Sequence, residues 1–308
     1  MHYIGVDVGG TSIKGIVIDE SGRILAENKR AFTSGERLAE DIALVVSALT
    51  SAAGGGAEGV GIGCPGMIDG ANGTVIFAGN LGLKNSPVAK DVESLTGLKV
   101  KITNDANAAA LGEAKFGAGK NYKNSILVTL GTGVGGGIVI DGKLMEGGKS
   151  AGAEIGHMVI KRNGNKCTCG RYGCFETYSS ATALIKRTKW AMEEDAGSLM
   201  WKSYTSDTAT GKTAFDYMDS DASAKEVVDW YISHLACGLT NLANIFRPEV
   251  IMLGGGVSNQ RERLTEPLQK LVDAEIFGGT QYAPVKIEIA ELGDRAGAIG
   301  AAALIMGD

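Results

Sequence analysis

Apolar and polar positions follow two periods along this chain, and together they predict a mixed α/β fold. Residues 3–8 and 15–19 are β-rich apolar runs on either side of the turn Gly9-Gly10-Thr11-Ser12, a pattern that predicts a hairpin. Apolar residues then recur at helical spacing over 36–53, and a short apolar run covers 59–63. Strand, helix and strand in this order predict a sheet with some parallel pairing.

The same two periods predict the remaining elements. Further strands are expected at 23–29, 100–103, 125–140 (a second hairpin), 250–253 and 285–290, and further helices at 86–97, 106–116, 177–194, 224–246, 261–275 and 295–306. Ser86 is expected to cap its helix, with Pro87 at the first helical position. Residues 77–85 are expected to form a polar loop, and 195–223 a variable excursion with short helices.

An internal repeat divides the chain into two halves. The segment Leu130–Asp141 repeats the glycines and β-branched residues of the first hairpin, and Gly131 lies 122 positions after Gly9. Two similar α/β lobes are therefore expected. The first would comprise 1–117 and about 296–308, because the last helix should pack back on it, and the second 118–295. The alternative is chance resemblance, since any buried hairpin favours glycine and β-branched residues.

Composition and charge narrow the class of protein. The chain has 308 residues, of which 44% are hydrophobic, and this is enough for two domains with their own cores. A formal net charge of −5 without a basic run argues against nucleic-acid binding. No apolar run is long enough to span a membrane, and a strand that begins at Tyr3 leaves no room for a signal peptide. We therefore expect a cytoplasmic protein without a nucleic-acid or membrane partner.

The first hairpin carries the chemistry of a phosphate site. Gly9 and Gly10 leave the backbone N–H groups of the turn open to a ligand. Thr11 adds a hydroxyl, Lys14 adds a cation, and Asp7 places a carboxylate inside an apolar strand. Glycines, a hydroxyl and one acid together suit a phosphate group with its metal ion.

Asn104 and Asp105 stand where a strand ends and a helix begins. A carboxylate in this position is stabilised by the helix N-terminus, and beside a phosphate site it can take the proton of an attacking hydroxyl. The alternative is that Asp105 only caps the helix.

Three cysteines and a histidine are spaced as H-x9-C-x-C-x4-C. His157, Cys167, Cys169 and Cys174 form a complete tetrahedral set for zinc, which leaves no open position for catalysis and therefore indicates a structural site. The alternative is three free thiols and a core histidine. Glu154 and Glu176 bracket this segment and could accept hydrogen bonds from a polyol, although solvated surface positions are the usual fate of glutamate.

Two further glycine runs could contact a nucleotide. Residues 131–136 satisfy G-x-G-x-x-G, but they precede a strand instead of the helix that a dinucleotide fingerprint requires. Gly254-Gly255-Gly256 does precede a helix and would let an adenosine lie against bare backbone. A plain strand-to-helix turn is the alternative for the second run.

Seven motifs spread over essentially the whole chain resemble the ROK family of repressors, open reading frames and sugar kinases: GVDVGGTSIKG, CPGMIDG, TNDANAAALGE, LGTGVGGG, AGAEIGH, CTCGRYGCFETYSS and IMLGGGVS. The resemblance implies a two-lobed actin-like ATPase fold with a structural zinc loop. It further implies two lobes that close on ATP and a sugar, and a homodimer.

The resemblance also implies roles for individual residues. Asp105 is similar to the catalytic base of the family, and Asp7 to the acid that meets Mg²⁺. Sugar contacts are implied for Gly66, Asn80, Asn104, Glu154, His157 and Glu176, with His157 also on zinc. Phosphate and nucleotide contacts are implied for Gly9, Gly10, Thr11, Lys14, Gly131, Thr132, Gly133, Gly135, Gly254, Gly255 and Gly256.

The implied activity is ATP-dependent phosphorylation of a hexose at its 6-hydroxyl. Repressor members carry an additional N-terminal helix-turn-helix, which is not found here and whose absence favours a kinase. The segment GNLGLKN resembles the glucokinase branch, although it lacks the tryptophan often found there. Kinases of N-acetylmannosamine, N-acetylglucosamine or fructose are the alternatives, and a sugar-sensing regulator without turnover is a more distant one.

Overall fold

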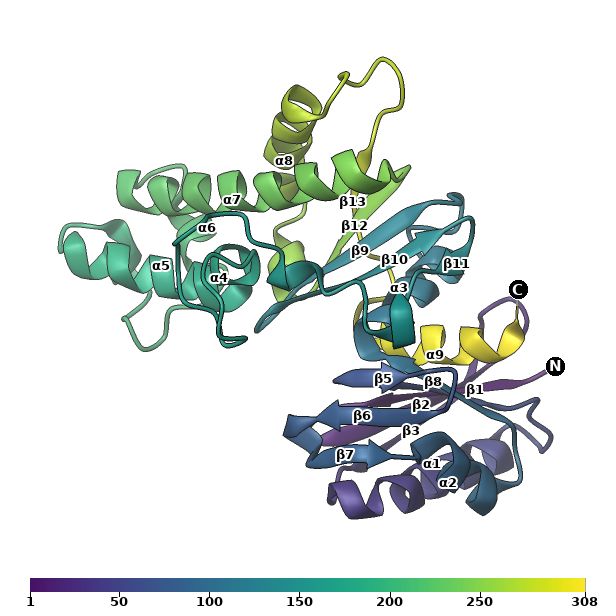
Figure 1. Ribbon diagram of the computed structural model, residues 1–308. Coiled ribbons are helices and arrows are strands. Elements are labelled where there is room, and N and C mark those ends of the chain that lie inside the picture. Colours follow the sequence, from purple (N-terminus) through teal and green to yellow (C-terminus); the bar gives the residue numbers. More distant parts are fainter. Residues whose placement is uncertain (308) are drawn as a thin grey trace. The chain divides into compact units, whose positions relative to one another are not determined.

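The computed structural model describes residues 1–307, which form two compact units (Figure 1). The first unit contains Met1–Leu127, Gly137–Ala153 and the residues from Glu291 onward. The second contains Val128–Gly136 and Glu154–Ala290. This division assigns 118–127, Gly137–Ala153 and 291–295 to the first unit, whereas the sequence had placed all of 118–295 in one lobe.

The first unit contains a five-stranded sheet of order β3-β2-β1-β4-β8. The antiparallel pairing of β1 with β2 and the parallel pairing of β1 with β4 confirm the predicted hairpin and the predicted parallel strands. β8 continues the sheet in parallel with β4. The strands are β1 (Tyr3–Val8), β2 (Ser12–Ile18), β3 (Ile24–Ala31), β4 (Val60–Cys64) and β8 (Val100–Asn104).

Different helices bury the two faces of this sheet. On one face Val6 packs in a cluster with Ile42, and on the other Ile16 packs with Ala298. This alternation follows from the period of two in a strand, which turns successive side chains to opposite faces. The helices of this unit are α1 (Leu38–Ala52), α2 (Val88–Thr96), α3 (Asp105–Phe116) and α9 (Ala296–Met306).

The last helix approaches the sheet so closely that only glycine fits at the contact. A Cβ atom at Gly5 of β1 would overlap the carbonyl oxygen of Ala298, and one at Gly61 of β4 would overlap that of Ala301. α9, drawn in yellow in Figure 1, therefore lies directly against the backbone of the first strands. The prediction that the terminal helix packs on the N-terminal elements is confirmed.

A second five-stranded sheet has the order β11-β10-β9-β12-β13, and a three-stranded sheet has the order β5-β6-β7. The second hairpin forms between β9 and β10, as predicted. The strands are β5 (Met67–Asp69), β6 (Thr74–Ala78), β7 (Leu83–Ser86), β9 (Ser125–Leu130), β10 (Val134–Ile140), β11 (Lys143–Leu144), β12 (Val250–Gly254) and β13 (Lys286–Ile289).

The helices of the second unit surround the long helix α7, whose apolar stripe includes Val228, Ile232 and Leu239. They are α4 (Glu176–Ser179), α5 (Ala181–Glu194), α6 (Thr213–Tyr217), α7 (Ala222–Phe246) and α8 (Glu262–Glu275). None of the helices among the described residues combines the length and apolarity that a membrane crossing needs.

Three local predictions were wrong, and in each case a competing interaction explains the difference. Ser86 does not cap α2, because it pairs with Val75 as the last residue of β7, and Pro87 then precedes the helix. The helix expected over 177–194 is divided at Ser180, whose hydroxyl accepts a hydrogen bond from the Ala183 N–H and caps α5. Residues 77–85 contain strand at both ends and a 3₁₀ turn over Gly79–Leu81 instead of a plain loop.

Candidate active site and metal centre

The polar residues of the first unit gather where its parallel strands end. Asp7 lies opposite Gly63 in the pairing of β1 with β4, and Cys64 lies opposite Asn104 in the pairing of β4 with β8. The carboxyl ends of these strands therefore bring Asp7, Cys64 and Asn104 to one edge of the sheet, and Asp105 follows directly. Ligands of α/β sheets bind at such an edge.

Asn104, and not Asp105, is the capping residue of α3. Its side-chain oxygen accepts hydrogen bonds from the N–H groups of Ala106 at 2.9 Å and Asn107 at 3.4 Å. Its Nδ2 donates to the carbonyl oxygen of Gly66 at 3.1 Å. The Oδ1 atom of Asp105 accepts a hydrogen bond from the Ala106 N–H at 2.9 Å, and the backbone N–H of Asp105 also bonds the carboxylate. The alternative that Asp105 serves only as the cap is therefore disfavoured.

Burial raises the pKa values of the acidic groups at this edge and so favours their neutral forms. Burial, followed by the charges of Asp105 and Asp294, raises the pKa of Asp7 to about 6 against the opposing effect of Lys14. Burial also raises the pKa of Asp105, although the hydrogen bond from Ala106 acts in the other direction. Burial and the two neighbouring carboxylates raise the pKa of the Cys64 thiol to about 12, which keeps it neutral. A raised carboxyl pKa suits a proton acceptor, and two close carboxylates attract a cation.

We expect Asp7→Asn to stabilise the protein at alkaline pH, measured without nucleotide and with a chelator of divalent ions. Because the folded protein keeps the Asp7 proton up to about pH 6, its free energy of unfolding should fall as pH rises from about 4 to 6. The variant should lack this fall and be more stable by about 1–2 kcal/mol at pH 8. Denaturant unfolding across pH measures both. Asp91→Asn, an exposed acid in the first turn of α2, is the control, and equal pH slopes in the two variants would contradict the expectation.

The first hairpin turn lies beside the segment that carries Asn80. The Gly9 N–H donates to the Ser12 carbonyl at 2.9 Å and closes the turn. A Cβ atom added at Gly10 would lie 3.9 Å from Asn80 Nδ2. Lys14 Nζ contacts a carboxylate oxygen of Asp294 at 3.4 Å. The structure thus brings the expected phosphate-binding turn and one expected sugar residue together.

Gly66 must be glycine for a conformational reason. Its φ angle is 104°, and a Cβ atom there would overlap the carbonyl oxygen of Phe77. Only glycine reaches this φ at no steric cost. Its carbonyl group then faces the amide of Asn104, so the two predicted sugar residues are joined by a hydrogen bond.

The second hairpin turn is fastened to α5 and lies against Glu176. The Gly131 carbonyl accepts from the Ala181 N–H at 2.8 Å, and the Thr132 carbonyl accepts from the Thr182 hydroxyl at 2.8 Å. A Cβ atom at Gly133 would come within 2.7 Å of Glu176 Oε2. These two carbonyls are thereby occupied by protein groups, and the Gly131 N–H donates to the Gly133 carbonyl at 3.1 Å, which closes the turn.

The third predicted glycine run follows β12. Gly255 has a φ of 85° and packs so closely behind Leu130 that a side chain would meet its backbone, whereas nothing lies near the Cβ position of Gly256. Within the second unit, Gly254–Gly256 therefore adjoins the strand that leads into the Gly131 turn. Gly135 lies one position inside β10.

The zinc ligands predicted from the sequence form one cluster. The ligand atoms of His157, Cys167, Cys169 and Cys174 all lie within 4.8 Å of one another. The Sγ atoms of Cys169 and Cys174 are 3.7 Å apart, and Cys167 Sγ is 3.6 Å from His157 Nδ1. Two sulfur ligands of a tetrahedral zinc ion are about 3.8 Å apart at a Zn–S distance of about 2.3 Å. The cluster therefore fits zinc, which would hold the loop in place.

Glu176 belongs to the surroundings of this cluster. Its Oε1 lies 3.0 Å from Cys167 Sγ and 3.8 Å from His157 Nδ1. Because Nδ1 is the imidazole nitrogen on the cysteine side, Nε2 is the one left for another partner. Glu154 is exposed and lies outside the cluster of ligand atoms.

Sequence reasoning missed two acids of the first unit. Asp294 pairs with Lys14 and contributes to the charge around Asp7. Glu113 is fully buried in α3 and accepts hydrogen bonds from the N–H groups of Ala118, Glu291 and Leu292. An acid in an alanine-rich helix was a signal for Glu113, but its distant partners carry no sequence mark.

The fold and the site define an α/β protein of the sugar-kinase class. The chain belongs to the ROK family, whose sequence profile matches residues 3–307. The matched segment includes every predicted site residue.

Relatives in this family are similar to the chain over nearly its whole length. A glucokinase of Thermotoga maritima is 38% identical over 313 residues, which cover 99% of this chain and 97% of the relative. A glucokinase of Streptomyces coelicolor is 37% identical over 317 residues, which cover 98% and 96%. The solved structure of a ROK family glucokinase from Streptomyces griseus, in complex with glucose and AMPPNP, matches with a TM-score of 0.81 and 37% identity over 99% of both chains.

Proposed function

We propose that this protein transfers the terminal phosphoryl group of ATP to the 6-hydroxyl of a hexose, and that the hexose is glucose. The observation that carries this assignment is the placement of the Asp105 carboxylate beside Asp7 at the edge of the parallel strands, in the same unit as a glycine-lined hairpin turn. The glucokinase relatives and the solved glucokinase complex support the choice of glucose and ATP.

Asp105 is the proposed general base. The Ala106 N–H fixes one of its oxygens, and burial raises its pKa, so the other oxygen can accept the proton of the sugar hydroxyl as that hydroxyl attacks. The N–H groups of the first hairpin, with Thr11 and Lys14, would bind phosphate oxygens. In the second unit, the turn of Gly131–Gly133, with Gly135 beside it, would bind phosphate and Gly254–Gly256 would line the adenosine.

Asp7 is the proposed residue for Mg²⁺. Its carboxylate is an oxygen ligand of the kind that Mg²⁺ prefers, and because burial raises its pKa, a bound cation would stabilise the charged form. When bound, the ion would supply charge neutralisation to the phosphates of ATP.

Sugar contacts are proposed for residues of each unit. The first unit offers Gly66, Asn80 and Asn104, and the second offers Glu154, Glu176 and His157. Nε2 of His157 is the nitrogen available for the sugar if Nδ1 is on zinc. We also propose a homodimer, which light scattering of the purified protein would test.

An ADP-release assay over a panel of hexoses tests the function. With ATP and Mg²⁺, we expect the largest kcat/KM with glucose, and lower values with mannose, fructose, N-acetylmannosamine and N-acetylglucosamine. Reactions without sugar control for ATP hydrolysis. If kcat/KM is higher for an N-acetylated sugar than for glucose, that sugar is the substrate in place of glucose. If calorimetry shows that a sugar binds but no sugar of the panel leads to ADP release, the protein is a regulator and not a kinase.

A further inference from the structure

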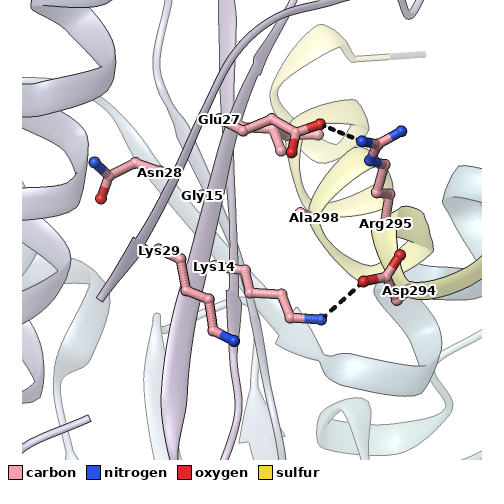
Figure 2. Close-up of a pocket in the computed structure, with 9 residues that line it drawn as sticks. Lys14, Gly15, Glu27, Asn28, Lys29, Asp294, Arg295 and Ala298 are labelled. Carbon is pink, nitrogen blue, oxygen red and sulfur yellow. Dashed lines mark hydrogen bonds and ion pairs between the residues drawn. The ribbon is translucent and has the colours of Figure 1, made fainter. Parts of the chain in front are cut away.

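A charged cavity of about 380 Å³ lies within the first unit, on the face of the sheet that α9 covers. Its lining comes from β2, β3 and the segment of Asp294, Arg295 and Ala298. Figure 2 shows Lys14 and Lys29 extending from neighbouring strands in the same direction, while Glu27 points across to Arg295. Asn28 points away, so it contributes only backbone.

The strand register places three charged residues in a row across this face. Asp7 of β1 lies opposite Lys14 of β2, and Lys14 lies opposite Lys29 of β3. Directly opposed residues of antiparallel strands point to the same face and lie close together. The two ammonium groups therefore repel each other, and like charges in this arrangement destabilise a sheet.

The acids of the cavity do not neutralise this pair. Asp294 contacts Lys14 at 3.4 Å, and Glu27 contacts Arg295 at 2.9 Å. Within residues 1–307 the Lys29 ammonium forms neither a hydrogen bond nor an ion pair. Three cations thus face two carboxylates in the cavity lining, while Asp7 lies opposite Lys14 in the sheet but outside the lining. Because Asp294 is 84% exposed and Glu27 is 47% exposed, both ion pairs are weak and can open for another anion.

We propose that this cavity binds a phosphate group, as free inorganic phosphate or as the phosphate of a monoester, between Lys29 and Lys14 with Arg295 at the rim. The doubly charged oxyanion would remove the repulsion between the two lysines, and guanidinium and ammonium groups are the usual donors to phosphate. The cavity volume falls in the range of small-molecule sites.

Occupation of the cavity has a consequence for the nucleotide. Lys14 is one of the residues proposed to bind ATP, so a phosphate held between Lys29 and Lys14 would compete for it. This consequence rests on the proposed function, whereas the binding itself does not. Phosphate should therefore raise the KM for ATP in the wild type and much less in a Lys29 variant.

Calorimetric titration with inorganic phosphate, in phosphate-free buffer at constant ionic strength set by chloride, tests the site without any turnover. A parallel titration with glucose 6-phosphate distinguishes a monoester from free phosphate as the preferred source. We expect Lys29→Gln to weaken binding roughly tenfold or more, because one charge-assisted contact is lost. Lys29→Arg should stay within a few fold of the wild type, because its donors and charge remain.

Lys90→Gln provides the matched control, since it removes one exposed lysine from α2 of the same unit, away from the cavity. Binding by this variant should equal that of the wild type. Three outcomes would overturn the site: no binding of either anion to the wild type, equal binding by Lys29→Gln and the wild type, or an equal loss in Lys29→Gln and Lys90→Gln. Because ATP and sugar are absent from the titration with inorganic phosphate, its outcomes do not depend on whether the protein is a kinase.

Discussion

Asp105→Asn is expected to lower kcat for glucose phosphorylation by roughly two to four decades while leaving the affinity for glucose nearly unchanged, since this is the range for loss of a general base. The amide oxygen of asparagine can still accept the Ala106 N–H, so α3 should keep its N-terminus. Because the amide cannot take a proton, the rise of kcat with pH that follows ionisation of Asp105 should disappear. Steady-state kinetics give kcat, and calorimetry with glucose gives the affinity.

Asp91→Asn is again a matched comparison for Asp105→Asn. It changes an acid to its amide in the first turn of a helix of the same unit, but at an exposed position away from the strand edge. Its kcat should equal that of the wild type. Full activity in the Asp105 variant would exclude Asp105 as the base, and a large loss of glucose affinity would show that Asp105 mainly binds the sugar.

Cys174→Ser is expected to abolish zinc binding and to lower the thermal unfolding midpoint by about 5 °C or more. Cys174 is completely buried, and a structural zinc ion contributes folding free energy directly, so even the loss of about 3–5 kcal/mol would shift the midpoint by this amount. Chelation of the wild type should produce a similar shift. Elemental analysis of the freshly purified protein measures zinc per chain, and calorimetry measures the midpoint.

Cys237→Ser serves as the control for the zinc experiment. Cys237 lies in α7 and is not one of the four clustered ligands. The zinc content of the Cys237→Ser variant should stay at one ion per chain. A zinc content near zero in the wild type would dismiss the metal centre, and an unchanged midpoint after complete removal of zinc would show that the ion does not stabilise the loop.

Local patterns were sufficient for much of the fold and for the metal centre. Gly9–Ser12 predicted its hairpin because glycines between apolar runs have few other solutions, and the cysteine spacing predicted a cluster because the four ligands lie within 18 residues of each other. The sequence placed Asn104 at the end of a strand, and the structure shows that Asp7 lies at the same edge, since parallel strands end together.

Features that depend on distant partners were beyond sequence reasoning. The Glu113 carboxylate binds N–H groups 178 and 179 positions away, and no periodicity reports such a pairing. Asp294 is missed in the same way, because only the fold brings it to Lys14. At Ser86 the error has another cause: the preference for a helix cap was real, but pairing with Val75 in a sheet was the stronger interaction.

The glycine-mediated contact of α9 with β1 and β4 also determines when the first unit can be completed during synthesis. A ribosome makes β1 first and α9 last among the described elements, so the face formed by Tyr3, Ile16 and Ile18 stays without its cover until residues 296–306 have emerged. Until then the nascent chain exposes an apolar sheet surface of the kind that chaperones bind. The second unit, whose residues end at Ala290, has no such dependence on the last helix.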